Sequence, residues 1–371
     1  MKGATKQIIG WIKKESVLVI AIVLAAVSVF MVPPDGQYAG YIDYKTIGLL
    51  FCLMSVMAGY QKIGIFQWMG QTLLTKVKMS RSVSAVLVFL CFFTSMFITN
   101  DVSLLTFVPF SLIVLEMAEM EELLVPVVVL QTIAANLGSM LLPFGNPQNL
   151  YLYTKFNIAN GEFVSIMALP FIISVLIITI CCIIFVKPEK LELDDEKIKI
   201  KPARTIIYLI LFVLSIAIVF RTIPYWIGLI IIPVALLFMD RKALKMVDYP
   251  LLFTFVFFFI FSGNMARIGA VREFISFLLE KSTLLVSVLS CQIISNVPSA
   301  ILLSQFTTNY PELLIGVNIG GAGTLVASLA SLITFKEFIR HNPDKIWYYI
   351  GMFSSFNFGF LILLVSIMIM F

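Results

Sequence analysis

The chain carries, in the middle of an apolar segment, the stretch NLGSMLLPFGNPQN at residues 136–149. Its glycines and prolines interrupt a helix, and its amide side chains are polar. A second stretch in the other half of the chain, NIGGAGTLVASLAS at residues 318–331, also begins with Asn and continues through glycines. Non-helical backbone at membrane depth is tolerated only where it is buried in protein or lines a wet cavity. The two breaks therefore predict a polar site in the membrane interior.

The composition predicts an all-α polytopic membrane protein. The 371 residues are 60% hydrophobic and 13% charged, with a mean hydropathy of +1.02, whereas ordinary soluble domains have about 25% charged residues. The five cysteines all lie in apolar segments, which suits buried hydrophobic residues better than disulfides. A thiol role of Cys91 and Cys291 toward arsenite is an alternative. The net charge of +5 is confined to loops, so we expect the lipid bilayer and no nucleic acid as partner.

Two further pairs of short matches occur in the same order as the breaks. TND at 99–101 corresponds to SNV at 295–297, and QKIGIFQ at 61–67 corresponds to ARIGAVR at 266–272. Ordered matches of this kind indicate an internal repeat. We expect a first repeat over 1–186, a cytoplasmic linker over 187–204 and a second repeat over 205–371.

Two segments are too long for a single span and carry a polar tip in the middle. Residues 83–117 have charged residues at both ends, and residues 283–309 have the same form. We interpret both as re-entrant hairpins, with tips at 99–101 and 295–297. Nine full crossings then remain, at 16–32, 46–60, 123–153, 165–186, 203–220, 226–239, 249–266, 311–335 and 347–371.

The basic residues predict the orientation, because Lys and Arg are concentrated in cytoplasmic loops. With the N-terminus inside and the C-terminus outside, twenty of the 26 Lys and Arg residues are cytoplasmic. The hairpins then enter from opposite faces of the plasma (inner) membrane, and the repeats are inverted. The basic residues expected outside are Lys45, Lys155, Arg221, Arg267, Arg272 and Lys281.

Inverted repeats with discontinuous helices point to a secondary transporter with its site near the bilayer midplane. The half-helix ends at each break can hold anions or cations, although small residues also serve simply to let helices pack closely. The residues expected to bind substrate are Thr99, Asn100, Asn146, Gln148, Asn149, Ser295, Asn296, Thr324 and Ser328.

Asp101 is an acid inside an apolar hairpin arm. An ionised acid in hydrocarbon is costly and usually marks an ion path or a substrate site, so we predict that it binds the coupling ion, H⁺ or Na⁺. A structural role, as a helix cap or at a water-exposed position, is the alternative. We expect no cofactor besides this ion, with Na⁺ at the hairpin tips if sodium is used. The residues expected around it are Asp101, Asn100, Gly145, Asn296 and Gly323.

These tips and breaks resemble those of the ion transporter superfamily, especially its divalent anion/sodium symporter branch, which includes citrate transporter-like proteins. That branch carries Ser-Asn-Thr at two hairpin tips and Gly-Thr-Pro-Pro-Asn-like breaks. The resemblance implies an elevator mechanism in a homodimer. An acid after the tip Asn is similar to the arsenite permease branch, whose members are commonly proton-linked. The matching positions are Thr99-Asn100-Asp101, Ser295-Asn296-Val297, Gly145 to Asn149 and Gly323 to Ser328.

The expected function is secondary active transport of a small anion or oxyacid by symport with Na⁺ or H⁺. Basic side chains are absent from the core of the apolar segments, and the single histidine, His341, lies in a polar loop, so substrates of low charge are favoured. Arsenite efflux and Na⁺/H⁺ exchange are alternatives on the same fold. A membrane enzyme is disfavoured because no His, paired carboxylates or Ser/Lys dyad is visible at depth. No P-loop motif is present, and broken-helix repeats fit alternating access better than a channel.

Overall fold

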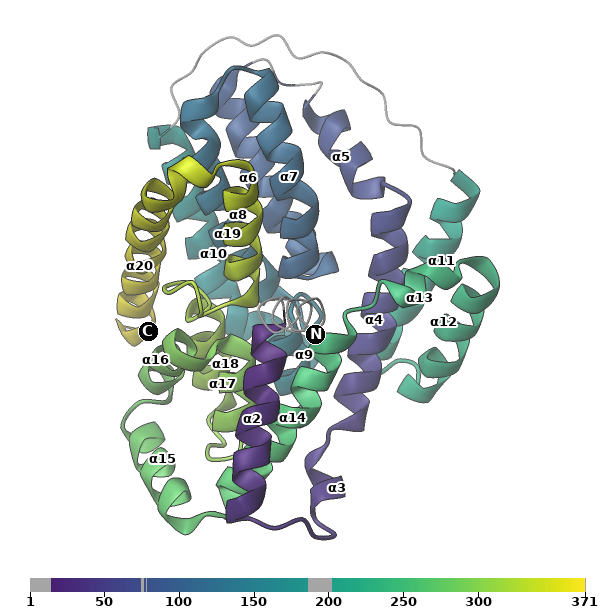
Figure 1. The fold of residues 1–371 in the computed structure, drawn as a ribbon, viewed down its shortest axis with the longest axis vertical. Coiled ribbons are helices and arrows are strands. Elements are labelled where there is room, and N and C mark those ends of the chain that lie inside the picture. The colour runs from purple at the N-terminus through teal and green to yellow at the C-terminus, as the bar shows by residue number, and fades with distance from the viewer. Residues whose placement is uncertain (1–14, 75–76, 78, 186–201, 371) are drawn as a thin grey trace, which may run out of the picture.

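The computed structural model describes residues 15–74, 77, 79–185 and 202–370. These residues form helices and no β-strand (Figure 1). Up to the segment 186–201, which lies outside the described residues and contains most of the linker expected at 187–204, the elements are α2 (Ser16–Met31), α3 (Tyr38–Tyr41), α4 (Tyr44–Lys62), α5 (Ile65–Leu74), α6 (Ser80–Ile98), α7 (Asn100–Met117), η1 (Glu121–Leu123), α8 (Leu124–Gly138), η2 (Ser139–Leu141), α9 (Pro147–Lys155) and α10 (Asn160–Phe185).

The second half of the chain is equally helical. Its elements are α11 (Pro202–Val219), α12 (Tyr225–Met239), α13 (Arg241–Lys245), α14 (Tyr249–Arg267), α15 (Gly269–Lys281), α16 (Thr283–Ile294), α17 (Asn296–Leu303), α18 (Tyr310–Ile319), α19 (Leu329–His341), η3 (Pro343–Lys345) and α20 (Ile346–Met370).

The lengths and apolar character of the helices make this an integral, polytopic membrane protein. Among the described residues, six helices are long and apolar enough to cross a membrane, or up to seven if α4 and α5, which are bent by 56°, form one span. The expected set of nine crossings differs because it includes shorter apolar helices such as α2 and α12 and treats α6 and α7 as hairpin arms. That number, the re-entrant character of the hairpins and the orientation of the termini remain predictions.

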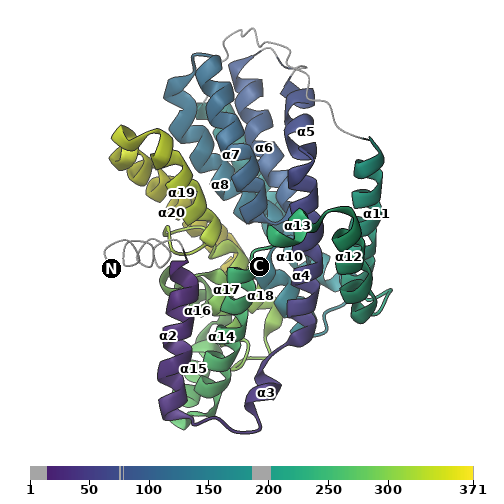
Figure 2. The same ribbon diagram turned by 45° about the vertical axis from the view of Figure 1, so that its right-hand side comes forward.

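Helices α6, α7 and α8 lie in the upper part of the molecule as drawn, α2 and α14 in the lower part, and α11 and α12 on the right beside α4 (Figure 1, Figure 2). In the apolar 18-residue stretch of Glu121–Leu141, which contains α8, 94% of the residues are buried, whereas in that of α10 only 22% are, so α10 presents most of its apolar surface outward. Helices α6 and α7 pack on α8, and α19 packs on both α7 and α8. On one flank α2 lies along α14, and on the other α11 and α12 pack against α4. The core therefore centres on α8 and the helices around it.

Each expected hairpin is a pair of packed helices joined by one strained residue. Thr99 joins α6 to α7 with φ 70° and ψ 150°, and Ser295 joins α16 to α17 with φ 76° and ψ 158°. This backbone region is almost exclusive to glycine and costs about 1–3 kcal/mol for other residues. Such strain persists only where the surrounding contacts fix it. Both tips are therefore held in place by their neighbours.

A pair of hydroxyl side chains at corresponding positions connects the two arms of each hairpin. Thr94 Oγ1 lies 2.9 Å from Ser103 Oγ across the first hairpin, and Ser290 Oγ lies 2.8 Å from Ser299 Oγ across the second. Both pairs join residues nine positions apart in the sequence. The two hairpins thus share a local construction despite their different sequences.

Both expected breaks are present in the backbone. Helix α8 ends at Gly138, η2 follows, and α9 begins at Pro147. Helix α18 ends at Ile319, and α19 begins only at Leu329. Gly138 is required for close packing rather than for an unusual backbone angle, because a Cβ atom there would lie 2.1 Å from the carbonyl oxygen of Phe92 on α6. The first break therefore starts where α8 lies against the backbone of α6.

We expect Gly138→Ala to destabilise the protein. The added methyl group meets backbone of α6 rather than a flexible side chain, and overpacking of this kind costs about 1–3 kcal/mol or more in the free energy of unfolding. Thermal unfolding in detergent measures the effect. The matched control is Gly161→Ala in α10, where a Cβ would have no neighbour within 4 Å and where alanine favours the helix by less than about 1 kcal/mol. Equal melting temperatures for the two variants would contradict the packing argument.

Candidate functional site

Asn136, at the last turn of α8, joins the first hairpin tip to the second break. Its Oδ1 accepts hydrogen bonds from Asn100 Nδ2 and from Ser328 Oγ, each 2.9 Å long. Its Nδ2 donates to the carbonyl oxygen of Gly321 at 3.5 Å and to Ser331 Oγ at 3.4 Å. The side chain is buried and fully paired. Asn136 therefore connects three segments at the centre of the molecule.

Asn318, at the end of α18, makes the corresponding contacts with the first break. Its Nδ2 donates to Asn149 Oδ1 at 2.6 Å, and its Oδ1 accepts from Asn146 Nδ2 at 3.0 Å. Asn146 also caps α9 by accepting from the backbone N–H of Asn149 at 2.9 Å. When the two matched stretches are aligned, position 136 matches 318, and positions 146 and 149 match 328 and 331. Each half of the chain thus inserts one Asn into the break of the other half.

The second hairpin tip is bonded to the second break through backbone. The N–H of Asn296 donates to the carbonyl oxygen of Ala327 at 2.9 Å, and Ser295 Oγ donates to the same oxygen at 3.3 Å. Asn296 Oδ1 accepts from the next N–H, that of Val297, just as Asn100 Oδ1 accepts from the N–H of Asp101. Both tips are consequently connected to the non-helical segment 320–328, the second tip directly and the first through the amide on α8.

Gln292, in the last turn of α16, holds that segment from its other side. Its Nε2 donates to the carbonyl oxygens of Gly320 at 2.9 Å and Ala322 at 3.2 Å, and its Oε1 accepts from the N–H of Thr324 at 2.8 Å. Gly323 has φ 122°, and a Cβ there would lie 2.1 Å from Gln292 Oε1. The positive φ and the close approach of the amide both require glycine at this position.

A cavity of about 120 Å³ lies beside the first tip, between the tip, α4 and the starts of α9 and α14. Its polar lining includes Thr99, Asp101, Asp248 and Gln61, and most other lining residues are apolar. The Oδ1 atom of Asp101 is buried and accepts no hydrogen bond among the described residues. Asp248 caps α14 by accepting from the N–H of Leu251 at 3.0 Å. The cavity is therefore lined by two acidic residues, and one of them has a buried carboxylate oxygen without a hydrogen-bond partner among the described residues.

Most of the chain, including both hairpin tips and the first break, matches a known protein family. Residues 8–312 match the model of the citrate transporter family. The chain belongs to the citrate transporter family. This membership agrees with the resemblance noted from the tips and breaks, and it makes the protein a membrane transporter.

Relatives of this citrate transporter family member include further transporters. The chain is 35% identical over 297 residues to an uncharacterized transporter of Methanocaldococcus jannaschii, covering 80% of this chain and 81% of that protein. It is 28% identical over 340 residues to the inner membrane protein YbiR of Escherichia coli, covering 88% of this chain and 87% of YbiR. A silicon efflux transporter of Oryza sativa is 33% identical over 124 residues, which is 33% of this chain and 24% of that protein. These names describe transporters and a membrane protein, not enzymes.

The site residues expected from the sequence fall into two groups by their position in the structure. Thr99 and Asp101 line the cavity beside the first tip. The others are buried in the hydrogen-bonded centre or lie next to it. Gly145 allows close packing of the backbone, because a Cβ atom at this position would lie 2.1 Å from the carbonyl oxygen of Ser139. Within the described residues no group of three or more His, Cys, Asp or Glu side chains could hold a metal ion. The residues of the second group are Asn100, Asn146, Gln148, Asn149, Ser295, Asn296, Thr324 and Ser328.

Four residues of this region were absent from the expected site. Asn136 and Asn318 occupy the same place in the two matched stretches, and that coincidence was the signal available for them. Gln292 is a polar residue in an apolar hairpin arm, which is also visible in the sequence. Asp248 gave no signal, because an acid ahead of a helix is usually only a cap. Its position on the Asp101 cavity depends on how α14 packs.

We expect Asn318→Leu to destabilise the protein strongly. It keeps the volume nearly constant but leaves Asn149 Oδ1 buried without its donor and removes one of the two acceptors of Asn146 Nδ2, and an unpaired buried group costs about 1–3 kcal/mol. Asn357→Leu is the matched control, because the Asn357 amide bonds only within its own helix and its Oδ1 has no partner. Chemical or thermal unfolding in detergent measures both. A loss at position 318 no larger than that at 357 would show that the interlocked amides contribute nothing.

Proposed function

We propose that the protein is a secondary active transporter that moves a small anion or oxyacid across the membrane, coupled to Na⁺ or H⁺. The observation that carries the proposal is that Asp101, in a member of a transporter family, lines a cavity and has a buried carboxylate oxygen, Oδ1, without a hydrogen-bond partner among the described residues. A buried carboxylate without a partner is costly. Binding of a proton or a cation removes that cost, and the free energy so gained can drive a conformational step.

The hydrogen bonds at the centre support two inverted repeats, over 1–186 and 205–371, joined by 187–204. A two-fold relation between the halves accounts for the hydroxyl pairs at corresponding positions of the two hairpins. It also accounts for the reciprocal placement of Asn136 and Asn318 in each other's breaks. Transporters built in this way have their substrate and ion sites between the repeats.

An elevator mechanism is supported by the contrast between two interfaces. Asp240 bonds to Lys62 and, at 3.2 Å, to the Tyr208 hydroxyl, which ties α4 to α11 and α12 as a scaffold. The cavity wall between α4 and the first tip is instead largely apolar, and its lining includes Leu53 of α4 and Val102 of α7. Apolar surfaces slide without breaking hydrogen bonds. We therefore propose that the hairpins and broken helices move against the scaffold, in a homodimer.

A substrate of low charge is supported by the charges of the cavity. Asp101 and Asp248 both oppose a multivalent anion unless a cation is bound beside them. The silicon efflux activity named for the Oryza sativa relative supports an oxyacid as the substrate class. Arsenite efflux remains the second candidate within this class. Na⁺/H⁺ exchange is the third, because the same two carboxylates would suffice for it.

We expect Asp101→Asn to abolish the ion dependence of transport in proteoliposomes while leaving the protein folded. The amide has nearly the shape of the carboxylate but neither binds a proton nor carries charge. Uptake of radiolabelled substrate under an imposed Na⁺ or pH gradient measures the effect. Asp344→Asn, at an exposed acid in η3, is the matched control. Unchanged ion dependence in the Asp101 variant would refute the coupling role.

The substrate class is tested by ligand-dependent stability. Citrate, succinate, sulfate and arsenite are screened against purified protein with and without Na⁺ and over a range of pH. A ligand present at about 100 times its Kd raises the free energy of unfolding by about 2.7 kcal/mol. Stabilisation by an anion only in the presence of Na⁺, or only at low pH, identifies both substrate and coupling ion. Stabilisation by Na⁺ and pH alone would favour the exchanger.

A further inference from the structure

A second cavity, of about 280 Å³, lies at the opposite end of α4 from the Asp101 cavity. It is lined by residues 40–43, which precede α4, by the C-terminal end of α9 and by α14. Its polar lining includes Tyr41, Asp43, Lys155 and Gln305. None of these side chains belongs to the hydrogen-bonded centre described above. The cavity is therefore a separate polar space.

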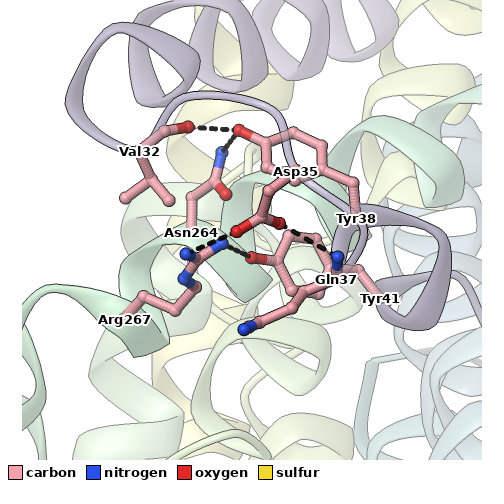
Figure 3. Close-up of polar contacts among 7 residues, drawn as sticks. All are labelled: Val32, Asp35, Gln37, Tyr38, Tyr41, Asn264 and Arg267. Atoms are coloured by element: carbon pink, nitrogen blue, oxygen red, sulfur yellow. Dashed lines mark hydrogen bonds and ion pairs between the residues drawn. The ribbon is translucent and has the colours of Figure 1, made fainter.

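The loop that forms one wall of this cavity is fixed to α14 (Figure 3). Arg267 donates to Asp35 at 2.8 Å and to the Tyr41 hydroxyl at 2.9 Å. Asn264 donates to the Tyr38 hydroxyl at 2.9 Å, and that hydroxyl in turn donates to the carbonyl oxygen of Val32. The hydrogen bond from Arg267 lowers the pKa of the Asp35 carboxyl, so this ion pair persists at neutral pH. Hydrogen bonds and an ion pair therefore hold this wall of the cavity in place.

Gly263 on α14 brings the ring of Tyr41 against the helix. A Cβ at position 263 would lie 2.5 Å from the Tyr41 ring. The ring therefore packs directly on α14 while it also lines the cavity. A larger residue at 263 would push the loop outward and open the wall.

Lys155 supplies a positive charge to the cavity that no carboxylate neutralises by contact. Its side chain is half-buried, and its Nζ lies 5.8 Å from the centroid of the Tyr151 ring. Lys155 forms no ion pair among the described residues. Asp43 lines the same cavity, but its carboxylate caps α4 by accepting from the N–H of Thr46 at 3.0 Å and from the Thr46 hydroxyl. The Tyr151 hydroxyl pairs with Ser304 at 2.9 Å.

We propose that this cavity binds a small carboxylate or oxyanion at Lys155. A half-buried ammonium group has fewer waters to solvate it and attracts an anion more strongly than an exposed one. Tyr41 and Gln305 supply further polar groups around the bound anion. The carboxylate of Asp43 lines the same cavity and weakens the binding, which suits a site that an anion enters and leaves readily.

The place of the cavity gives the site a role in transport, and this step rests on the proposed function. Helix α9 begins at Pro147, which lines the Asp101 cavity, and ends at Lys155 in the second cavity. Its nine residues span about 13 Å at a rise of about 1.5 Å per residue. The two cavities thus lie at the two ends of one short helix, α9. The Lys155 site thus holds the anion before or after its passage, on the side of the protein opposite to the Asp101 cavity.

The direct test is protection of Lys155 from an amine-specific acetylating reagent, measured by mass spectrometry on purified protein in detergent. Citrate and sulfate are the probes, with chloride at the same ionic strength as reference. A site occupied at about four times its Kd slows acetylation of Lys155 about fivefold, with a saturable concentration dependence. Lys281 is the matched control, because it is exposed and its Nζ lies 4.2 Å from the Phe277 ring centroid. Equal acetylation of Lys155 with and without both anions overturns the proposal.

Substitutions at the two charges give a second, directional test. Asp43→Asn keeps the helix cap and removes the opposing charge, so it is expected to tighten anion binding. Lys155→Gln removes the positive charge and is expected to weaken anion binding. Each change alters the apparent Kd by about tenfold. Lys155→Arg keeps binding close to that of the unmodified protein. The readout is the citrate concentration that half-maximally raises the melting temperature; because the Asp101 cavity is the same in all three variants, a difference between them reports the Lys155 cavity. The same affinity in the Asp43→Asn and Lys155→Gln variants would overturn the assignment.

These tests separate the site from the proposed function. Protection of Lys155 in a protein that transports no anion supports the site and counts against the transport proposal. Anion transport without protection of Lys155 supports transport and overturns the site. In proteoliposomes that transport an anion, Lys155→Gln raises the KM for that anion from the side of the second cavity and leaves the ion dependence unchanged.

Discussion

The structure depends on how two breaks in buried helices satisfy their backbone polar groups. Hydrocarbon offers no water, so every N–H and C=O freed from a helix needs a partner within the protein. Side-chain amides provide many of these partners. Asn149 donates to the carbonyl oxygen of Met140 at 3.0 Å, and Gln292 holds the carbonyl oxygens of Gly320 and Ala322. The amide-rich centre follows from this need.

The same requirement makes the centre stiff and interlocked. Asn136 and Asn318 each reach into the break of the other half, so neither break can rearrange without unpairing buried groups in both. Unpaired polar groups in a low-dielectric interior are costly. Motion during transport is then expected as a rigid body, at apolar surfaces such as that between α4 and the first hairpin tip, rather than within the centre. This division between a stiff centre and an apolar sliding surface is the physical basis for the elevator mechanism proposed above.

Charge is placed at the edges of this stiff centre. Asp101 lines one cavity and Lys155 lines another, and α9 runs from the first to the second. An acid on one side and a base on the other give the two ends of the proposed path different chemistry. The first suits a cation and the second an anion. The proposed transporter, which couples the movement of an anion to that of a cation, needs both kinds of site.

Local sequence patterns were enough to predict the helical class, the breaks at 136–149 and 318–331 and the tips at Thr99 and Ser295, because apolar runs, glycines and prolines act over a few residues. They also singled out Asp101, since an acid in an apolar arm is conspicuous without any structure. The pairing of the amides could not be predicted in this way, and the folded chain places most of the expected binding amides in the packed centre instead of on a cavity. Folding likewise brings Asp248 to Asp101, and Lys155 to Tyr41, because contacts between residues far apart in the chain arise from helix packing that no local pattern encodes.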